Sequence, residues 1–279
     1  ASSIPRITTR RILSLALPAL GALIAEPLFT VIDSTMVGHL GTPELAGLGI
    51  ASTVLNTAVG LFVFLAYSTT SLAGRHLGAG RRDRAIRSGV EAMWLAGALG
   101  VLAALLLAVC ASPLLSWLGA DAATMPHALA YLRSSAPGLV GMFVVLAATG
   151  TLRGLQDTRT PLVAASVGAA FNAAANWTLM YPLGLGVAGS GLGTAITQSL
   201  MALFLAWVIV RAARREGVEL SPSVAGIFSA AAEGAPLLVR TLALRVALLA
   251  TLSAVTAIST QALAAHQIVW TLWSFAAYV

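Results

Sequence analysis

The stretch GVEAMWLAGALGVLAALLLAVCA, residues 89–111, contains a single charged side chain, Glu91. An α-helix needs about 20 mostly apolar residues to cross the hydrocarbon core of a bilayer, and this stretch is long and apolar enough to do so. A strand of a membrane barrel would instead alternate polar and apolar residues over about ten positions, and no such alternation is present. We therefore predict that residues 89–111 cross a membrane as a helix.

The same pattern recurs along the chain. The other apolar runs of this kind are residues 12–37, 48–72, 127–151, 160–183, 190–210 and 235–258, and an eighth begins near Ala262 and is still apolar at Val279. Of the 279 residues, 58% are hydrophobic and 9% charged, whereas soluble domains carry about a quarter charged residues. This composition argues against a soluble enzyme or a disordered chain, and the single Cys110 excludes an intramolecular disulfide framework. We predict an all-α polytopic membrane protein.

All 16 basic residues are arginines, and with 10 acidic residues they give a net charge of +6. Thirteen arginines lie on alternate connections between the predicted spans, at Arg6, Arg10, Arg11, Arg75, Arg81, Arg82, Arg84, Arg87, Arg153, Arg159, Arg211, Arg214 and Arg215. The opposite connections, residues 38–47, 112–126, 184–189 and 259–261, contain none. Because positive loops stay in the cytoplasm, we expect a cytoplasmic N-terminus, with no nucleic-acid partner needed to explain the charge. The first run lacks a cleavage site and is expected to be retained.

A weak internal repeat relates the two ends of the chain at an offset of 218 residues. Leu17–Leu20 aligns with Ala235–Leu238, and Thr42–Gly47 aligns with Thr260–Ala265. Chance similarity in an alanine- and leucine-rich chain is the alternative. A true repeat would mean six helices per lobe, and duplicated lobes are typical of secondary transporters.

The repeat predicts three parts. Residues 1–210 form an N-terminal six-helix lobe, residues 211–234 a cytoplasmic linker, and residues 235–279 the first two helices of a second, pseudo-symmetric lobe. On this interpretation the chain is truncated at its C-terminus and lacks about four further helices.

Polar side chains inside the apolar runs are few, and such groups tend to face a bundle interior or a cavity. The ones that we select are Glu26, Asp33, Asn172, Asn176, Thr194 and Gln198. Glu26 and Asp33 share one helical face, as do Asn172 and Asn176. One carboxylate with amide and hydroxyl oxygens can hold a small cation or a proton, and competition with a substrate would supply the coupling that an antiporter needs. Interhelical hydrogen bonding without further function is the alternative for the amides and Thr194.

Three motifs resemble signature stretches of the multidrug and toxic compound extrusion (MATE) transporters. They are Asp33–Gly41 (DSTMVGHLG), Gly154–Pro161 (GLQDTRTP) and Ala262–Ile268 (ALAAHQI). The resemblance implies two six-helix lobes around a central cleft in the plasma (inner) membrane of a bacterium. It also implies a monomer, neither enzyme nor cofactor-dependent, that exports small amphiphilic or cationic compounds in exchange for H⁺ or Na⁺.

The resemblance also implies a cation site in the first lobe. Asp33, Asn172, Asn176 and Thr194 fall on its positions, and Asn176 departs from the family because an acid is common there. The missing charge favours H⁺ over Na⁺ as the coupling ion, with no other metal expected. Pro18 matches a first-helix proline at which bending has been proposed, although we favour a static kink as the interpretation.

The predicted second lobe offers Arg240 and Arg245 where some members of the family carry an acid, and no acid follows Glu233. This pattern resembles the DinF-like branch. Arg240 and Arg245, together with Glu26 and Gln198, are candidates for the substrate cleft. Two alternatives stay open: a lipid-linked precursor flippase of the related exporter group, and a membrane-embedded scaffold.

Overall fold

The computed structural model describes Leu20, residues 31–258 and Val269, and the chain divides into two compact units after Gly234. Within the described residues all regular secondary structure is α-helical. Residues 31–38 form a helix, and the helices that follow are α2 (Thr42–Phe62), α3 (Phe64–Gly78), α4 (Arg82–Trp117), α5 (Met125–Ser135), α6 (Gly138–Gly154), α7 (Arg159–Met180), α8 (Gly186–Arg215) and α9 (Val224–Ile258).

Among the described residues, five helical segments are long and apolar enough to cross a membrane, and the bent pair α5–α6 makes a sixth. They coincide with the predicted spans from residues 48–72 onward, so the all-α polytopic fold is confirmed. The first predicted span, 12–37, enters the described residues mainly at 31–37, which are helical. The eighth run, from Ala262, lies outside the described residues apart from Val269.

The helices extend beyond the apolar runs that predicted them. α4 has 36 residues and α8 has 30, lengths of about 54 and 45 Å at 1.5 Å per residue. Hydropathy marks only the part of a helix inside the hydrocarbon, whereas the hydrogen-bonded spiral continues on polar residues outside it. For the same reason the segment 211–234, predicted as a linker, is largely helical: only residues 216–223 separate α8 from α9. The assignment of lobes on either side of it stays a prediction.

One predicted span is bent. Residues 127–151 were expected to form one helix, but α5 and α6 meet at an angle of 53° around Ala136 and Pro137. Proline has no backbone N–H to donate to the preceding turn, so a helix bends or breaks there. The sequence therefore contained the signal for the bend, Pro137, but hydropathy alone treats residues 127–151 as one continuous run.

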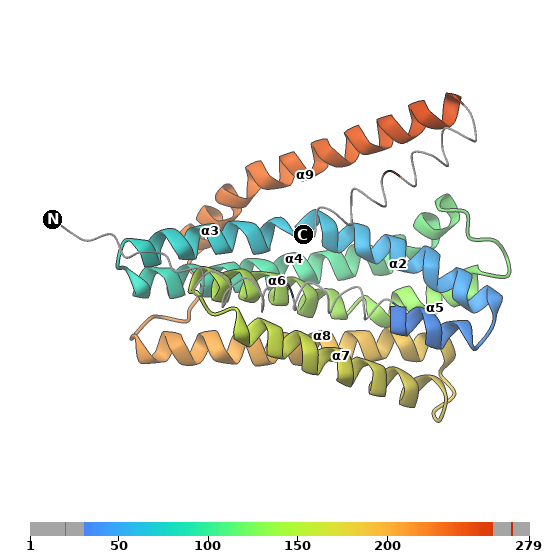
Figure 1. Cartoon of the computed structure of the whole chain (residues 1–279), viewed down its shortest axis with the longest axis horizontal. Helices are drawn as coiled ribbons and strands as arrows, with labels where there is room; N and C mark the ends of the chain where they lie inside the picture. The colour runs from blue at the N-terminus through green and yellow to red at the C-terminus, as the bar shows by residue number, and fades with distance from the viewer. Residues whose placement is uncertain (1–19, 21–30, 259–268, 270–279) are drawn as a thin grey trace. The chain divides into compact units, whose positions relative to one another are not determined.

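Helix α6 lies among α3, α4 and α8, and glycines bring their backbones together (Figure 1). A Cβ atom at Gly141 would lie 2.7 Å from the carbonyl carbon of Gln198 on α8, and one at Gly154 2.7 Å from the carbonyl oxygen of Thr70 on α3. From the α4 side, a Cβ at Gly100 would lie 2.6 Å from the Cα of Val140. Small residues at helix contacts are the usual solution in a membrane, where apolar lipid competes with apolar side chains.

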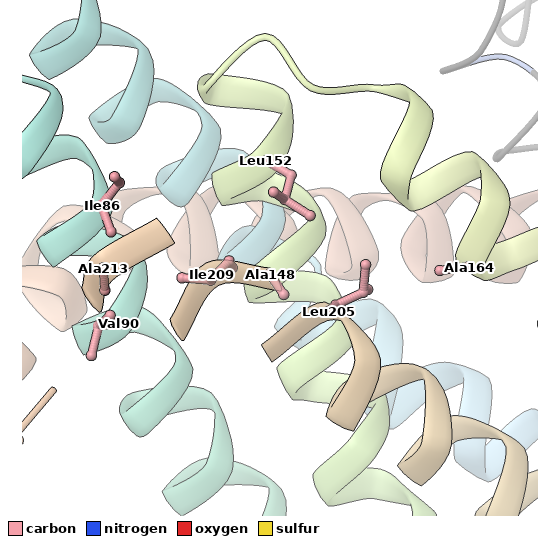
Figure 2. Close-up of a cluster of buried hydrophobic side chains, with 8 residues drawn as sticks. All are labelled: Ile86, Val90, Ala148, Leu152, Ala164, Leu205, Ile209 and Ala213. Atoms are coloured by element: carbon pink, nitrogen blue, oxygen red, sulfur yellow. The ribbon is translucent and has the colours of Figure 1, made fainter. Parts of the chain in front are cut away.

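An apolar cluster fills the space between these helices toward their arginine-bearing ends (Figure 2). It combines Ile86 and Val90 of α4, Ala148 and Leu152 of α6, Ala164 of α7, and Leu205, Ile209 and Ala213 of α8. Ile86, Ala148, Leu205 and Ala213 are fully buried. The cluster joins four helices of the first unit into one packed body.

Two loop carboxylates cap helices at opposite ends of the bundle. Asp121 Oδ1 accepts hydrogen bonds from the backbone N–H of Thr124 (2.8 Å) and from its hydroxyl (2.8 Å), ahead of α5. These hydrogen bonds hold the pKa of the Asp121 carboxyl below its usual range. Asp157 Oδ1 accepts the N–H of Thr160 (3.0 Å) in the first turn of α7, an interaction that stabilises helix N-termini.

The contact at Gly100 yields a test of this packing. Gly100→Ala forces α4 away from Val140 and is expected to lower the free energy of unfolding by about 1–3 kcal/mol. Gly97→Ala, on the same helix, places its methyl group where no atom lies within 4 Å, so its effect should stay within about 0.5 kcal/mol. Melting temperatures of both variants in one detergent provide the comparison. Equal behaviour of the two variants would contradict close α4–α6 packing.

Candidate functional site

Asp33 lies inside the first unit with only 8% of its surface exposed. It is held by the helix of residues 31–38 and faces α5, α7 and α8 through hydrogen bonds. Among the described residues no arginine or histidine pairs with it. A buried carboxylate without a positive partner is costly, so this group is suited to binding a cation or a proton.

The hydrogen bonds to Asp33 come from three helices. Its Oδ1 accepts from Asn176 Nδ2 of α7 (3.0 Å) and from the hydroxyl of Ser190 on α8. Its Oδ2 lies 3.5 Å from the Tyr131 hydroxyl of α5, at the limit of a hydrogen bond. Neutral donors therefore surround the carboxylate and fix its position without cancelling its charge.

A second layer of polar groups lies behind these donors. Asn176 Nδ2 also donates to Asn172 Oδ1 (3.2 Å), and Asn172 Nδ2 lies 3.5 Å from the hydroxyls of Thr194 and Thr197. Thr197 in turn donates to the Gly193 carbonyl at 2.7 Å. The chain of contacts links Asp33 to two successive turns of α8.

Asn176 is fully buried, yet its Oδ1 has no hydrogen-bond partner among the described residues. Buried polar atoms are nearly always paired, so an unpaired amide oxygen next to a carboxylate marks a position suited to a cation or a proton donor. It is the one atom of this network whose bonding capacity is left unused in the described structure.

The glycine-rich start of α8 allows this network to form. A Cβ at Gly193 would collide with Asn176 Oδ1, and one at Gly189 would lie 2.7 Å from the carbonyl carbon of Leu179 on α7. Only glycine lets α8 approach α7 closely enough for Asn176 and Ser190 to share one carboxylate oxygen.

The Asp33 side chain lines a cavity of about 280 Å³ in the first unit. Asn172, Thr194 and Gln198 also line it, and most of the remaining wall is apolar. Arg153, in the last turn of α6, lines the same cavity, and its Nε is buried without a hydrogen-bond partner among the described residues. The cavity thus has both a carboxylate and a guanidinium in its wall.

The structure therefore brings together the four residues predicted for a cation site, Asp33, Asn172, Asn176 and Thr194. Of the predicted cleft residues, Gln198 lines the cavity. Arg240 and Arg245 lie exposed on the part of α9 that belongs to the second unit. Glu26 and Pro18 lie outside the described residues. The roles assigned to all of these residues stay predictions.

Sequence reasoning missed four residues: Tyr131, Ser190, Thr197 and Arg153. Tyr131 and Ser190 contact Asp33 from helices distant in the chain, and no local pattern predicts such a contact. Thr197 lies three residues after Thr194, so helical periodicity places it beside the selected threonine. Arg153 had been assigned to a cytoplasmic connection because it closes an apolar run.

These features define a class: a multi-pass helical membrane protein with a buried, unpaired carboxylate at a cavity. Comparison with known proteins identifies the family. The sequence profile of the MatE family matches residues 18–178, more than half of the chain. The chain belongs to the MATE family of transporters.

Relatives occur in bacteria and plants. The chain is 32% identical over 276 residues to Protein DETOXIFICATION 44, chloroplastic, of Arabidopsis thaliana, covering 94% of this chain and 52% of the relative. It is 31% identical over 188 residues to DNA damage-inducible protein F of Escherichia coli, covering 66% of this chain and 40% of the relative. It is 29% identical over 198 residues to the probable multidrug resistance protein NorM of Geobacillus kaustophilus, covering 68% of this chain and 43% of the relative. The chain spans about half the length of these relatives or less.

Solved structures show the same fold. A MATE transporter crystallised in its bent conformation superposes with a TM-score of 0.84 at 24% identity, over 96% of this chain and 61% of that one. A MOP superfamily transporter from Pyrococcus furiosus superposes with a TM-score of 0.80 at 24% identity, over 95% and 60%. This chain therefore corresponds in fold to a large part of a complete transporter.

Replacing the residue that departs from the family tests the site. Asn176→Asp keeps the side-chain shape and adds a second carboxylate beside Asp33, which should create a Na⁺ site. Because a ligand that binds only the folded state stabilises it, NaCl at a hundred times the dissociation constant adds about 2.7 kcal/mol. The melting temperature in NaCl minus that in choline chloride is the measurement, and we expect a rise for Asn176→Asp and little difference for the unmodified chain.

Asn56→Asp is the matched control, because Asn56 lines the same cavity outside the Asp33 network. It should show no Na⁺-specific stabilisation. Na⁺-specific stabilisation of the unmodified chain would overturn the preference for H⁺ as the coupling ion. If Asn176→Asp shows no Na⁺-specific stabilisation, Asp33 and Asn176 do not form a cation site.

Proposed function

We propose that this protein exports small amphiphilic, often cationic compounds in exchange for a cation, and that Asp33 carries that cation. One observation supports the proposal above all: a buried carboxylate without a positive partner among the described residues lines a cavity in the first unit. The multidrug resistance proteins among the relatives agree with a small-molecule substrate. No cofactor is required in this scheme.

The coupling follows from competition for one charge. With Asp33 ionised, the cavity attracts a cationic substrate, and with Asp33 protonated that attraction disappears and the substrate is released. Only a ligand that binds two states differently shifts their balance, and the proton does so through the hydrogen bonds of Asp33 to three helices. We propose that these helices move relative to one another when the proton binds.

We propose H⁺ rather than Na⁺ as the coupling ion. Asp33 supplies one carboxylate, and the neighbouring Asn176 supplies an amide in place of a second. A proton needs only the single carboxylate, whereas a Na⁺ ion would have to rely on neutral oxygens for its other ligands. We further propose that the arginine-bearing helix ends lie on the cytoplasmic side of a bacterial inner membrane and that the protein acts as a monomer.

Arg153 favours a second candidate, a lipid-linked precursor flippase. Its guanidinium in the cavity wall suits the phosphate of such a substrate. The first proposal is preferred because Asp33 and mostly apolar side chains line the same space, whereas a flippase cleft would be predominantly cationic.

Transport in lipid vesicles tests the first proposal. A pH gradient imposed without a Na⁺ gradient should drive ethidium flux through the reconstituted protein, and a Na⁺ gradient at constant pH should drive much less. Asp33→Asn should reduce the pH-driven flux to that of empty vesicles because it removes the titrating group. Asp83→Asn, which neutralises an exposed acid at the start of α4, is the control and should leave the flux unchanged. Retained pH-driven flux in Asp33→Asn would disprove the mechanism.

Equilibrium binding provides a test that requires no transport. Ethidium binding to the purified protein should weaken as the pH falls, by about tenfold for each 1.4 kcal/mol of lost interaction. Asp33→Asn should bind ethidium weakly at every pH, since no charge is left to titrate. Binding of a phosphate-bearing polyprenyl lipid in preference to ethidium, with loss of that binding in Arg153→Gln, would instead establish the flippase function.

A further inference from the structure

A pocket of about 480 Å³ lies at the arginine-bearing end of the first unit, away from the cavity at Asp33. The end of α3, the start of α4 and the first turns of α9 form its walls. Four arginines line it, at Arg75, Arg81, Arg84 and Arg87, together with His76 and two glutamates, Glu91 and Glu233. We call it the arginine pocket.

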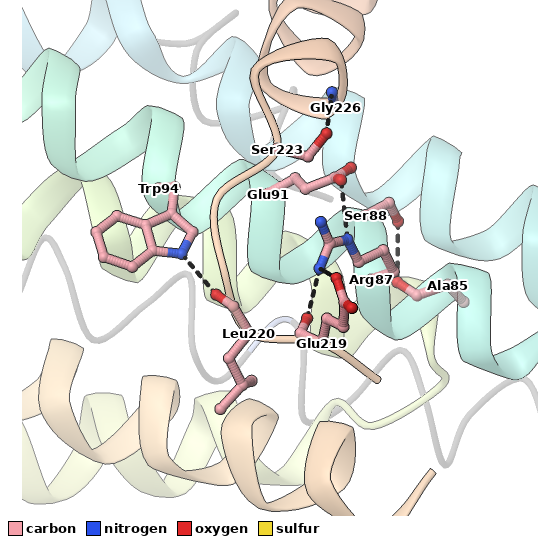
Figure 3. A network of polar contacts seen from close by, with 9 residues as sticks. All are labelled: Ala85, Arg87, Ser88, Glu91, Trp94, Glu219, Leu220, Ser223 and Gly226. Carbon is pink, nitrogen blue, oxygen red and sulfur yellow. Dashed lines mark hydrogen bonds and ion pairs between the residues drawn. The ribbon is translucent and has the colours of Figure 1, made fainter. Parts of the chain in front are cut away.

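Two of the arginines form ion pairs, one of which joins two walls of the pocket. Arg75 Nη2 lies 2.7 Å from Glu233 Oε2 and joins α3 to α9. Arg87 Nε lies 2.9 Å from Glu91 Oε1, and its Nη1 donates to the Glu219 carbonyl at 2.6 Å (Figure 3). Both glutamates of the pocket are thereby engaged.

The other two arginines leave the pocket with unbalanced positive charge. Arg81 and Arg84 form no ion pair within the described part of the chain. His76 adds a buried Nδ1 without a hydrogen-bond partner there. Four guanidinium groups and two carboxylates line the pocket, so its lining carries a net positive charge that would attract an anion.

The pocket lies at the depth of lipid headgroups. The apolar run of α4 begins two residues after Arg87, and Trp94 lies seven residues after Arg87, which is about 10 Å of helix. The indole Nε1 of Trp94 donates to the Leu220 carbonyl at 3.0 Å, while half of the side-chain surface stays exposed (Figure 3). Tryptophan with this combination of apolar ring and polar tip is typical of the membrane interface.

We propose that the arginine pocket binds a phosphate-bearing anion, and that Arg81 and Arg84 are the groups that bind it. The planar guanidinium donates two parallel hydrogen bonds to phosphate oxygens. Because the pocket lies near the membrane interface, the ligand in the membrane is the headgroup of an acidic phospholipid. Basic protein segments are attracted to such lipids. The site is separate from the Asp33 cavity, with which it shares no lining residue. Binding there would stabilise the α3–α4 connection against the start of α9.

Lipid retention by the purified chain tests the proposal. In native mass spectrometry from a neutral detergent, phosphatidylglycerol should be retained in preference to phosphatidylcholine. The double variant Arg81→Gln with Arg84→Gln should bind phosphatidylglycerol about tenfold more weakly, a loss of about 1.4 kcal/mol. The double variant Arg81→Lys with Arg84→Lys keeps the charge but lacks the paired donors. Its affinity for phosphatidylglycerol should lie between that of the unmodified chain and that of the Gln double variant.

Arg214→Gln with Arg215→Gln is the matched control, because it removes the same charge from exposed residues at the end of α8 that do not line the pocket. It should retain phosphatidylglycerol like the unmodified chain. Equal losses in the two Gln double variants would overturn the proposal, as would the absence of any preference for the acidic lipid.

Inorganic phosphate and soluble glycerol phosphate distinguish the two sources of the anion. If they raise the melting temperature as much as phosphatidylglycerol does, and only while Arg81 and Arg84 are present, the pocket binds soluble phosphate and the assignment to lipid is wrong. If the lipid alone does so, the assignment to a headgroup stands.

Discussion

Close backbone contact at glycine positions holds the helices of the first unit together, and the polar site depends on it. In a membrane, burying apolar side chains between helices gains little over leaving them in lipid, so close packing and interhelical hydrogen bonds provide the stabilisation. Gly100, Gly141 and Gly154 admit neighbouring backbones around α6. Gly189 and Gly193 do the same between α7 and α8, and without them Asn176 and Ser190 would not reach one carboxylate.

The close packing of these helices surrounds the Asp33 carboxylate with hydrogen-bond donors from α5, α7 and α8. Its charge is surrounded by neutral donors, and Asn176 Oδ1 beside it lacks a partner in the described structure. A carboxylate in this environment would respond to a proton or cation that reaches it, and its hydrogen bonds connect it to three helices. The same features that make the group costly for stability make it suitable for coupling.

The arginines have more than one role. Their alternation along the chain predicts which connections lie on the cytoplasmic side under the positive-inside rule. At one end of the bundle two of them form the ion pairs Arg82–Glu216 and Arg75–Glu233. Arg153 departs from this pattern by lining the cavity. Counting charges along a sequence treats these groups alike, whereas their surroundings give them different chemistry.

The sequence alone determined the position and order of the apolar helices within the described residues, because each one satisfies its own backbone hydrogen bonds and hydropathy reports it locally. It also singled out Asp33, Asn172, Asn176 and Thr194, since polar groups are rare in such runs. The bend at Pro137 was missed because hydropathy joins the residues on both sides of it into one apolar run. The extension of α8 to Arg215 and the start of α9 at Val224 were missed because hydropathy does not report how a helix continues outside the lipid. Only the tertiary structure decided which groups meet: Tyr131 and Ser190 are 98 and 157 residues from Asp33 along the chain. Contacts at such separations follow from how whole helices pack, which no local pattern encodes.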